Sequence, residues 1–453
     1  MSAVNPRRWW ALIVLAAAQF MVIMDTSIIG VALPDMQREL GFTDSSLQWV
    51  FNAYVVAFGG LLLLGGKLSD LLGARKIFTA GWVVLTAGSV VAAAAGTVWV
   101  EILGRAVQGV GGALIAPAAM TLLMMLFGHD PRELGKAMSL YGAAAPAGGT
   151  AGVFLGGVIT EYLSWPWVFI VYVPIGLATL AAVPALLPKA AGKRGSVDWL
   201  GGIAVTAGVA LAVYAIVTAD WLAGAGAAVL LVAFLFIQRS VREPLMPLVI
   251  WKTPGLAAAN LAMALLGAAW IPMWYFLNLY LQKTLGYGSF ASGAALLPMT
   301  VAVMIFMVGI TARLLGRFGA KPLIVLGLGV LAVGIAGLSL VGANGSFVTD
   351  VLPASLIAAV GMSLAYIPAM MSAMSGVRPE EAGLASGIVN TTYNVGSALG
   401  LAVMTAIATG QGSTNAAFVG AAVVAAIGAV ATVAFMRRPK AVAQETRQPA
   451  TLA

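Results

Sequence analysis

The sequence has 453 residues, of which 61% are hydrophobic and only 9% are charged, and its mean hydropathy is +0.99. A soluble domain carries about 25% charged residues, so this composition excludes an ordinary soluble protein and indicates a polytopic membrane protein. The absence of cysteine excludes disulfides, thiolate metal sites and a cysteine nucleophile.

Long apolar runs rich in glycine and alanine favour helices packed through small side chains over the alternating strands of a β-barrel. With roughly 20 apolar residues for each crossing, the sequence predicts an all-α polytopic membrane protein with fourteen transmembrane helices. The first of them is expected to be retained, because no small-residue cleavage site follows it. The expected ranges are 9–34, 46–66, 77–96, 98–127, 134–160, 166–188, 198–218, 221–238, 255–282, 289–312, 320–342, 348–375, 381–410 and 415–436.

The distribution of basic residues predicts the orientation in the membrane. If the N-terminus is cytoplasmic, every Lys and Arg except Arg38, Lys283 and Arg105 falls in a cytoplasmic segment. We therefore expect a multi-pass protein of the cell (inner) membrane with both termini cytoplasmic. The net charge of +8 then reflects membrane topology and predicts no nucleic-acid partner.

Two features of the chain repeat at similar offsets. The basic, glycine-containing turn at 66–75 matches 312–321, and Pro117 with its neighbours matches Pro368 with its neighbours. A parallel repeat of this kind predicts two six-helix halves. The predicted units are an N-terminal bundle at 1–190, two extra helices with flanking loops at 191–245, a C-terminal bundle at 246–436 and a disordered cytoplasmic tail at 437–453.

Asp25 places a carboxylate inside the first apolar run. A charge near the bilayer centre costs roughly 2.5–3.5 kcal/mol on insertion scales, so such a residue usually faces a protein interior or a wet cavity. With a rise of 1.5 Å per residue, Asp25 lies ~24 Å along its helix from Trp9, and Arg105 lies ~10 Å into the fourth helix from the opposite side. The two charges are therefore expected at similar depths, where they can pair.

Such a pair has two interpretations. Removal from water favours the neutral acid of Asp25 and a nearby guanidinium favours the carboxylate, so movement of Arg105 would load and release a proton. The alternative is a static brace between two helices, or an Arg105 that binds backbone carbonyls. Glu101, one turn from Arg105, is expected either to pair with it or to lie solvated at the outer mouth, which leaves Asp25 as the only acid predicted deep in a membrane helix.

Three motifs carry a family resemblance that covers essentially the whole chain. Residues 25–34 match a first-helix motif, 66–76 match a loop motif of Gly, Leu, Asp, Gly and basic residues, and 105–109 match a fourth-helix motif. On these motifs the sequence resembles the major facilitator superfamily, and specifically its fourteen-helix drug/proton antiporters of the QacA and EmrB type. It departs from the group at Gly30, where Asn is usual, and at Val153, where the antiporter motif of the fifth helix has Pro.

The resemblance implies the major facilitator fold, with its helices arranged as 6 + 2 + 6, and roles for particular residues. Asp25 and Arg105 would couple transport to the proton, and Asp70, Gly73 and Arg75 would form a cytoplasmic gate latch between the halves. Topological anchoring is the alternative for the basic residues of this turn.

A glycine stripe runs along the fifth predicted helix, with Gly148, Gly152 and Gly156 at four-residue spacing. Such a stripe allows another helix to pack closely or to slide. The resemblance implies that it lines the contact between the halves and serves a rocking motion, whereas close packing alone is the alternative.

Polar and aromatic side chains on otherwise apolar helices are candidates for a substrate site. Structural hydrogen bonds and interfacial placement are the alternatives for them. The predicted substrate-binding residues are Gln108, Asn52, Tyr54, Tyr141, Trp270, Trp274, Asn278, Asn390, Tyr393 and Asn394.

The sequence therefore predicts a secondary transporter that exports a lipophilic compound, including cationic drugs or antibiotics, against proton entry. A facilitator or symporter for a small metabolite stays open because of Val153, and a non-transporting membrane sensor or enzyme is a rival of another class. No phosphate-binding loop is present and His129 is the only histidine, so neither ATP drive nor a histidine metal site is expected. We expect no cofactor apart from the coupling proton, a monomer, and the lipid bilayer and a small lipophilic substrate as partners.

Overall fold

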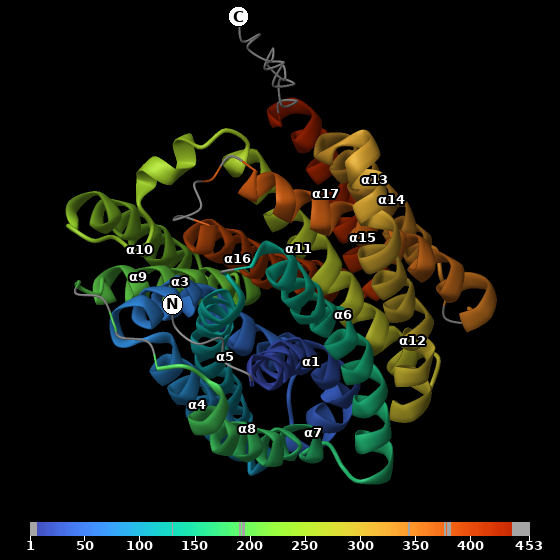
Figure 1. The fold of residues 1–453 in the computed structure, drawn as a ribbon. Coiled ribbons are helices and arrows are strands. Elements are labelled where there is room, and N and C mark those ends of the chain that lie inside the picture. The colour runs from blue at the N-terminus through green and yellow to red at the C-terminus, as the bar shows by residue number, and fades with distance from the viewer. Residues whose placement is uncertain are drawn as a thin grey trace, which may run out of the picture.

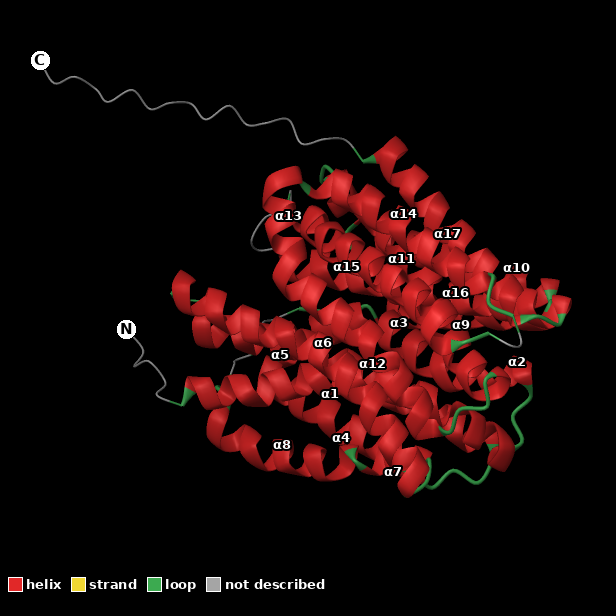
Figure 2. Ribbon diagram, turned by 90° about the vertical axis from the view of Figure 1, so that its right-hand side faces the viewer, coloured by secondary structure: helices red, strands yellow, loops and turns green. Residues whose placement is uncertain are grey.

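The computed structural model describes residues 7–128, 130–189, 192, 195–342, 345–375, 377 and 382–436. Its helices form two bundles (Figure 1), with α1, α4, α5 and α8 on one side of the molecule and α11, α14, α15 and α17 on the other in both Figures 1 and 2. The predicted tail at 437–453 lies outside the described residues.

The first bundle is built from long apolar helices. In it α1 packs along α6, and α5 packs against α3 and α4. Its elements are α1 (Arg8–Leu40), α2 (Asp44–Leu47), α3 (Trp49–Leu72), α4 (Ala74–Ala93), α5 (Val98–Phe127), α6 (Pro131–Tyr162), α7 (Trp167–Ile170) and α8 (Tyr172–Leu186).

Two further helices, α9 (Trp199–Thr218) and α10 (Trp221–Ser240), pack on each other, and α9 also contacts α3 and α16. The Asp198 carboxylate accepts hydrogen bonds from the backbone of Gly201 at 2.7 Å and from Gln238 Nε2 at 2.6 Å, which ties the two helices together. Lys67 Nζ donates to Glu243 at 2.9 Å and holds the pKa of that exposed carboxyl below its usual range. Polar groups therefore anchor this pair to the first bundle at one end.

The second bundle repeats the layout of the first, with α14 packed against α15 and α17, and α11 packed against α16. In the described residues, one short π-helical turn extends the end of a helix (η2), one interrupts a helix (η3) and one begins a helix (η4). Its elements are η1 (Leu248–Lys252), α11 (Leu256–Leu279), η2 (Tyr280–Thr284), α12 (Ser289–Ile305), η3 (Phe306–Ile310), α13 (Thr311–Phe318), α14 (Ala320–Ser339), η4 (Phe347–Val351), α15 (Leu352–Met374), α16 (Ala382–Gln411) and α17 (Thr414–Phe435).

The internal repeat predicted from the sequence has a structural counterpart. Gly73 joins α3 to α4 with φ 96°, and Gly319 joins α13 to α14 with φ 78°, a region that glycine adopts without strain. A Cβ at Gly88 would lie 2.7 Å from a backbone nitrogen of α5, and a Cβ at Gly334 would equally collide with the backbone of α15. Both halves therefore use the same glycine turn and the same glycine contact between neighbouring helices.

Within the described residues, twelve helices are long and apolar enough to cross a membrane. Two of the fourteen predicted segments are not among them. In the segment 289–312, α12 has 17 residues before a π-helical turn interrupts the α-helix. In the segment 381–410, α16 has 30 residues, and its middle carries Asn390 and Asn394.

The predicted ends of the first two helices, at 34 and 66, fall short of the observed ends at Leu40 and Leu72. The segment 98–127 agrees with α5, whereas α1 continues to Leu40 and was expected to end at Pro34. Pro34 lies inside the helix, and the chain turns only at Gly41, whose φ of 76° is left-handed. Pro34 therefore did not end this helix: it removes its own N–H bond to the Gly30 carbonyl, a loss that transmembrane helices tolerate.

The bundles meet through α6 with α12 and through α3 with α16. We call the end where α1 begins, to the left in Figure 2, the terminal end, and the opposite end, which holds α2, the distal end. Polar bonds join the bundles at the distal end: Lys283 Nζ to Asp44 at 2.9 Å, and Gln282 Nε2 to the Val31 carbonyl at 3.0 Å. The ribbons of the two bundles diverge toward the terminal end (Figure 2).

Candidate functional site

An ion pair lies inside the first bundle. Arg105 Nη1 of α5 donates to Asp25 Oδ2 of α1 at 2.7 Å, and the two side chains are 0% and 1% exposed. The similar depths predicted from the sequence therefore correspond to a direct contact between the two helices.

The guanidinium of Arg105 has several other partners. Its Nε donates to the Val50 carbonyl of α3 at 2.8 Å, and its Nη1 donates to Gln108 Oε1 at 2.7 Å. Its carbon lies 4.7 Å from the centre of the Tyr54 ring, in cation–π geometry. Arg105 therefore pairs with a carboxylate and binds a backbone carbonyl at the same time.

Gln108 extends the network to the next helix. Its Nε2 donates to Ser89 Oγ of α4 at 2.8 Å, and Ser89 donates to the Leu85 carbonyl. In this conformation the Gln108 amide is engaged within the bundle and does not line an open site.

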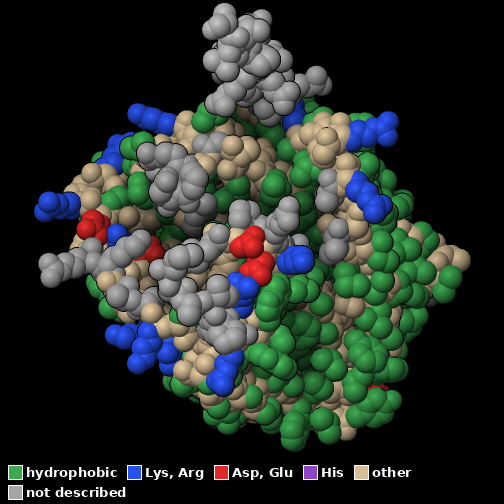
Figure 3. Space-filling model, in the orientation of Figure 1, with side chains coloured by type: hydrophobic (Ala, Val, Ile, Leu, Met, Phe, Trp, Pro, Cys, Tyr) green, Lys and Arg blue, Asp and Glu red, His purple; other side chains and the backbone are tan. Residues whose placement is uncertain are grey.

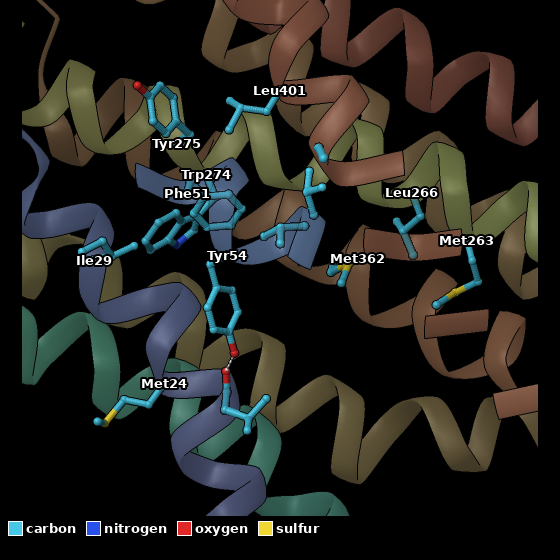
Figure 4. Close-up of a cluster of buried hydrophobic side chains, with 14 of the residues drawn as sticks. Met24, Ile29, Phe51, Tyr54, Met263, Leu266, Trp274, Tyr275, Met362 and Leu401 are labelled. Atoms are coloured by element: carbon cyan, nitrogen blue, oxygen red, sulfur yellow. Dashed lines mark hydrogen bonds between the residues drawn. The ribbon is translucent and has the colours of Figure 1, made fainter. Parts of the chain in front are cut away.

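Three other candidates of the first bundle are also engaged by neighbouring residues. The Tyr54 hydroxyl donates to the Val22 carbonyl at 3.2 Å, the dashed contact in Figure 4. Asn52 Nδ2 donates to Gln48 one turn earlier, and the Tyr141 hydroxyl donates to Gln19 of α1 at 2.9 Å. All three side chains are buried; Tyr54 and Tyr141 tie α3 and α6 to α1, whereas Asn52 bonds only to the N-cap residue of its own helix.

The candidates on α16 are more open. Asn390 and Asn394 are half-buried, and each amide NH₂ donates to a carbonyl one turn earlier, at 2.9 Å and 2.8 Å. Their amide oxygens have no hydrogen-bond partner among the described residues and are free to accept. Tyr393 packs edge-on against Tyr366 of α15, with ring centres 5.5 Å apart, and no sequence pattern had singled out Tyr366.

Trp274 of α11 joins the two bundles near the distal end. A Cβ at Gly30 of α1 would overlap its ring, so the missing side chain at this position makes room for the indole. Figure 4 draws Trp274 in one buried cluster with Ile29 of α1 and Phe51 of α3. Asn278, one turn on, is buried and donates to the Trp274 carbonyl at 3.2 Å, whereas Trp270 is half-buried.

Glu101 is a buried acid, for which the sequence analysis left open a pair with Arg105 or a solvated place at the outer mouth. It lies in the first turn of α5 and is 0% exposed, and neither of its carboxylate oxygens has a hydrogen-bond partner in the described structure. The prediction that Asp25 is the only deeply buried acid was therefore wrong. The sequence spacing could have indicated this burial, because Glu101, Arg105 and Gln108 lie on one face of the helix.

The predicted latch residues do not bridge the bundles in this conformation. Arg75 Nη1 donates to the Leu187 carbonyl at 3.2 Å, within the first bundle. Asp70 is exposed and has no partner among the described residues, and Gly73 supplies the left-handed turn between α3 and α4.

The glycine stripe of α6 faces α1, although it was expected to line the contact between the halves. Cβ atoms at Gly148, Gly152 and Gly156 would approach the backbone of Phe20, Met24 and Ile28, each one turn after the last. The contact with α12 is made by the next face of the helix, where Gly157 and Val153 approach Gly293. Adjacent residues of a helix point about 100° apart, so the glycine stripe and the residues that contact α12 lie on different faces of α6.

Two packed helical bundles with twelve candidate spans in the described residues indicate a multi-pass membrane protein, and a buried ion pair between such helices is typical of transporters. The family model of the Major Facilitator Superfamily matches residues 15–401 and 366–451. The chain belongs to the major facilitator superfamily, as its motifs predicted.

Its relatives include resistance and export proteins. It is 37% identical to the puromycin resistance protein pur8 of Streptomyces alboniger over 426 residues. This aligned region covers 90% of this chain and 83% of that protein. It is 36% identical over 418 residues to the cephamycin export protein CmcT of Amycolatopsis lactamdurans, over 89% of this chain and 86% of that protein. Among solved structures, the nucleoside transporter NupG shares the fold, with a TM-score of 0.69 and 14% identity over 94% of this chain and 99% of that chain.

Proposed function

We propose that this protein exports small lipophilic compounds of the antibiotic type in exchange for protons, by alternating access. The observation that carries the proposal is the Asp25–Arg105 ion pair, buried in a transporter whose relatives include proteins for puromycin resistance and cephamycin export. Buried charges in membrane segments are costly and usually mark an ion or substrate pathway.

The ion pair supplies a device for coupling. Next to Arg105 the Asp25 side chain is stable as a carboxylate, and a proton that binds Oδ2 makes a neutral acid and ends the ionic attraction. Arg105 keeps its bond to the Val50 carbonyl, so protonation loosens α1 from α5 without releasing the guanidinium to lipid. Because α1 contacts the second bundle at Gly30 and Trp274, this change reaches the contact between bundles.

We assign the terminal end to the cytoplasm. Lys and Arg side chains surround the terminal face in Figure 3, and such residues are concentrated on the cytoplasmic side of membrane proteins. Both termini are then cytoplasmic in the cell (inner) membrane. The polar bonds at the distal end close the transporter toward the outside, so the described conformation faces the cytoplasm.

A count of fourteen crossings, arranged 6 + 2 + 6 as in the QacA and EmrB type, forms part of the proposal. A count of fourteen requires that α16 crosses the membrane. It also requires that α12, η3 and α13 cross as one continuous segment, which runs without a gap from Ser289 to Phe318. The bundles are then 1–190 and 246–436, with 191–245 between them. An even count of crossings also keeps the start of α1 and the end of α17 on the same side of the membrane. We propose a monomer, because one chain contains the complete pair of bundles.

The substrate site is proposed between the bundles, on the half-buried faces of α11 and α16. Asn390 and Asn394 offer free amide oxygens, and Trp270 and Tyr393 offer aromatic faces. Aromatic faces and a few polar acceptors suit a lipophilic molecule and attract a cationic one.

Purified protein in proteoliposomes tests the proposal, with puromycin and ethidium as probes. The expected result is uptake into the vesicles when their lumen is acidic, with proton release from the lumen in step with uptake. Uptake that ignores the pH gradient would instead support a facilitator, and uptake that follows the proton inward would support a symporter. Absence of movement for these and for a panel of metabolites would support a sensor.

A further inference from the structure

Glu101 is unusual because nothing in the described structure compensates its charge. It is fully buried, and both carboxylate oxygens lack a hydrogen-bond partner. An acid that capped α5 would accept a backbone N–H of the first turn, and Glu101 accepts none. An ionised carboxylate in this position is strongly disfavoured, so Glu101 holds a proton in this conformation.

The surrounding helices provide one cation for two carboxyl groups. The charged groups are Arg105 on the same helix and Asp25 on α1, and the remaining titratable groups are Tyr54 of α3 and Tyr172 of α8. The distal half of α4, which packs along α5, carries no titratable side chain. One guanidinium therefore balances one carboxylate, and the other carboxyl group must be neutral.

Arg105 also has a donor without a partner. Its Nη2 is buried and has no hydrogen-bond partner, although Nη1 and Nε are both engaged. Glu101 precedes Arg105 by four residues, and side chains at this spacing are neighbours on a helix surface. A vacant donor and two vacant acceptors thus belong to neighbouring side chains on one helical face.

We propose that Glu101 is a second proton-binding carboxyl of this transporter and the alternative partner of Arg105, which it takes when Asp25 is protonated. This inference rests on the proposed proton coupling and extends it to a residue outside the family motifs described above. In the described state Asp25 is the carboxylate and Glu101 the acid. In the exchanged state one proton has moved from Glu101 to Asp25, and the cluster keeps the same net charge.

The position of Glu101 suits this role. Four residues along α5 place it about 6 Å nearer the distal end than Arg105. Under the proposed orientation protons arrive from that end, so Glu101 meets them before Asp25 does and passes one on as Arg105 changes partner.

Infrared difference spectroscopy on the purified full-length protein in lipid nanodiscs tests the exchange without any drug or gradient. At neutral pH the wild type is expected to show the carbonyl band of a protonated carboxylic acid, and Glu101→Gln is expected to lack it. Asp25→Asn is also expected to lack the band although Glu101 is intact, because Arg105 without its partner draws Glu101 into the ionised form. The matched control, Glu39→Gln, removes an exposed acid near the distal end and is expected to keep the band.

Retention of the band in Glu101→Gln, or its retention in Asp25→Asn, would overturn the proposal. If Glu101→Gln cannot be recovered folded, the Asp25→Asn comparison decides alone. Since the spectra require no transport, their outcome is independent of whether the protein is an antiporter.

A transport measurement separates this role from a structural one. With Gln at position 101, protonation of Asp25 leaves Arg105 without a carboxylate. Gradient-driven puromycin uptake should then require a roughly tenfold higher proton concentration, so its pH profile should shift by about one unit toward acid. The variant Glu101→Asp should restore the wild-type profile. Identical pH profiles for wild type and Glu101→Gln would mean that the residue only packs.

Discussion

At the scale of single residues, the guanidinium of Arg105 decides whether Asp25 can remain ionised inside the bundle. It lies 2.7 Å from the carboxylate and is fixed by the Val50 carbonyl and the Tyr54 ring. Because the pair is fully buried, each charge depends on the other much more than in a surface ion pair.

Arg105→Ala is therefore expected to lower the free energy of unfolding by about 3–5 kcal/mol, because it leaves a buried carboxylate without a partner. Thermal unfolding in detergent micelles measures this. The control is Arg38→Ala, which breaks a pair whose arginine is 73% exposed and should change stability by less than about 1 kcal/mol. Equal stability of the two variants would contradict the assigned burial of the pair.

Gly30 tests the contact between the bundles. Gly30→Ala is expected to cost about 1–3 kcal/mol, because the added Cβ overlaps the Trp274 ring and forces it to move. In a Trp274→Ala background the same change should cost much less, and the coupling energy from a double-mutant cycle on unfolding measures the difference. Additive effects would show that the two residues do not share this space.

Residue-level prediction from the sequence succeeded where a charge interrupts a hydrophobic pattern, as at Asp25 and Arg105. It failed at Glu101, because a position near a helix end does not reveal whether the neighbouring helices cover it. It did not select Tyr366, since an aromatic residue on an apolar helix differs from its core neighbours only through its contacts.

At the scale of elements, the α1–α6 contact positions Asp25. The glycines of α6 let the backbone of α1 approach closely along one continuous line that includes Met24, the neighbour of Asp25. The stripe itself was visible in the sequence, whereas the helix that it faces was not. Which helix the stripe faces depends on how α6 is rotated about its own axis, and only the packed structure defines this rotation.

Gly152→Ala is expected to displace α1, because its Cβ would lie 2.8 Å from the Met24 carbonyl oxygen and 2.9 Å from Ser27 Cβ. The expected cost is about 1–3 kcal/mol in thermal unfolding, with a matching loss of proton-coupled transport. Gly142→Ala, in the same helix with open space around the added Cβ, is the control and should be neutral or slightly stabilising. A stable Gly152→Ala protein with full coupling would show that α1 is not held by this contact.

At the scale of the whole molecule, the fold follows from features that the sequence displays openly: long apolar segments, glycine turns at Gly73 and Gly319, and a parallel repeat. The superfamily and the two-bundle fold were therefore predictable. The conformation was not, because every conformation of an alternating-access transporter contains the same helices. It is the bonds at the distal end, such as Lys283 to Asp44, that distinguish the described state.

The central claim is that proton coupling resides in the Asp25–Arg105 pair. Its most direct test is puromycin transport by Asp25→Asn in proteoliposomes, with Glu39→Gln, which changes an exposed acid near the distal end, as control. The account predicts that Asp25→Asn loses uptake driven by a pH gradient but keeps exchange of puromycin at equal pH, whereas Glu39→Gln keeps both. Undiminished gradient-driven uptake by Asp25→Asn would contradict it.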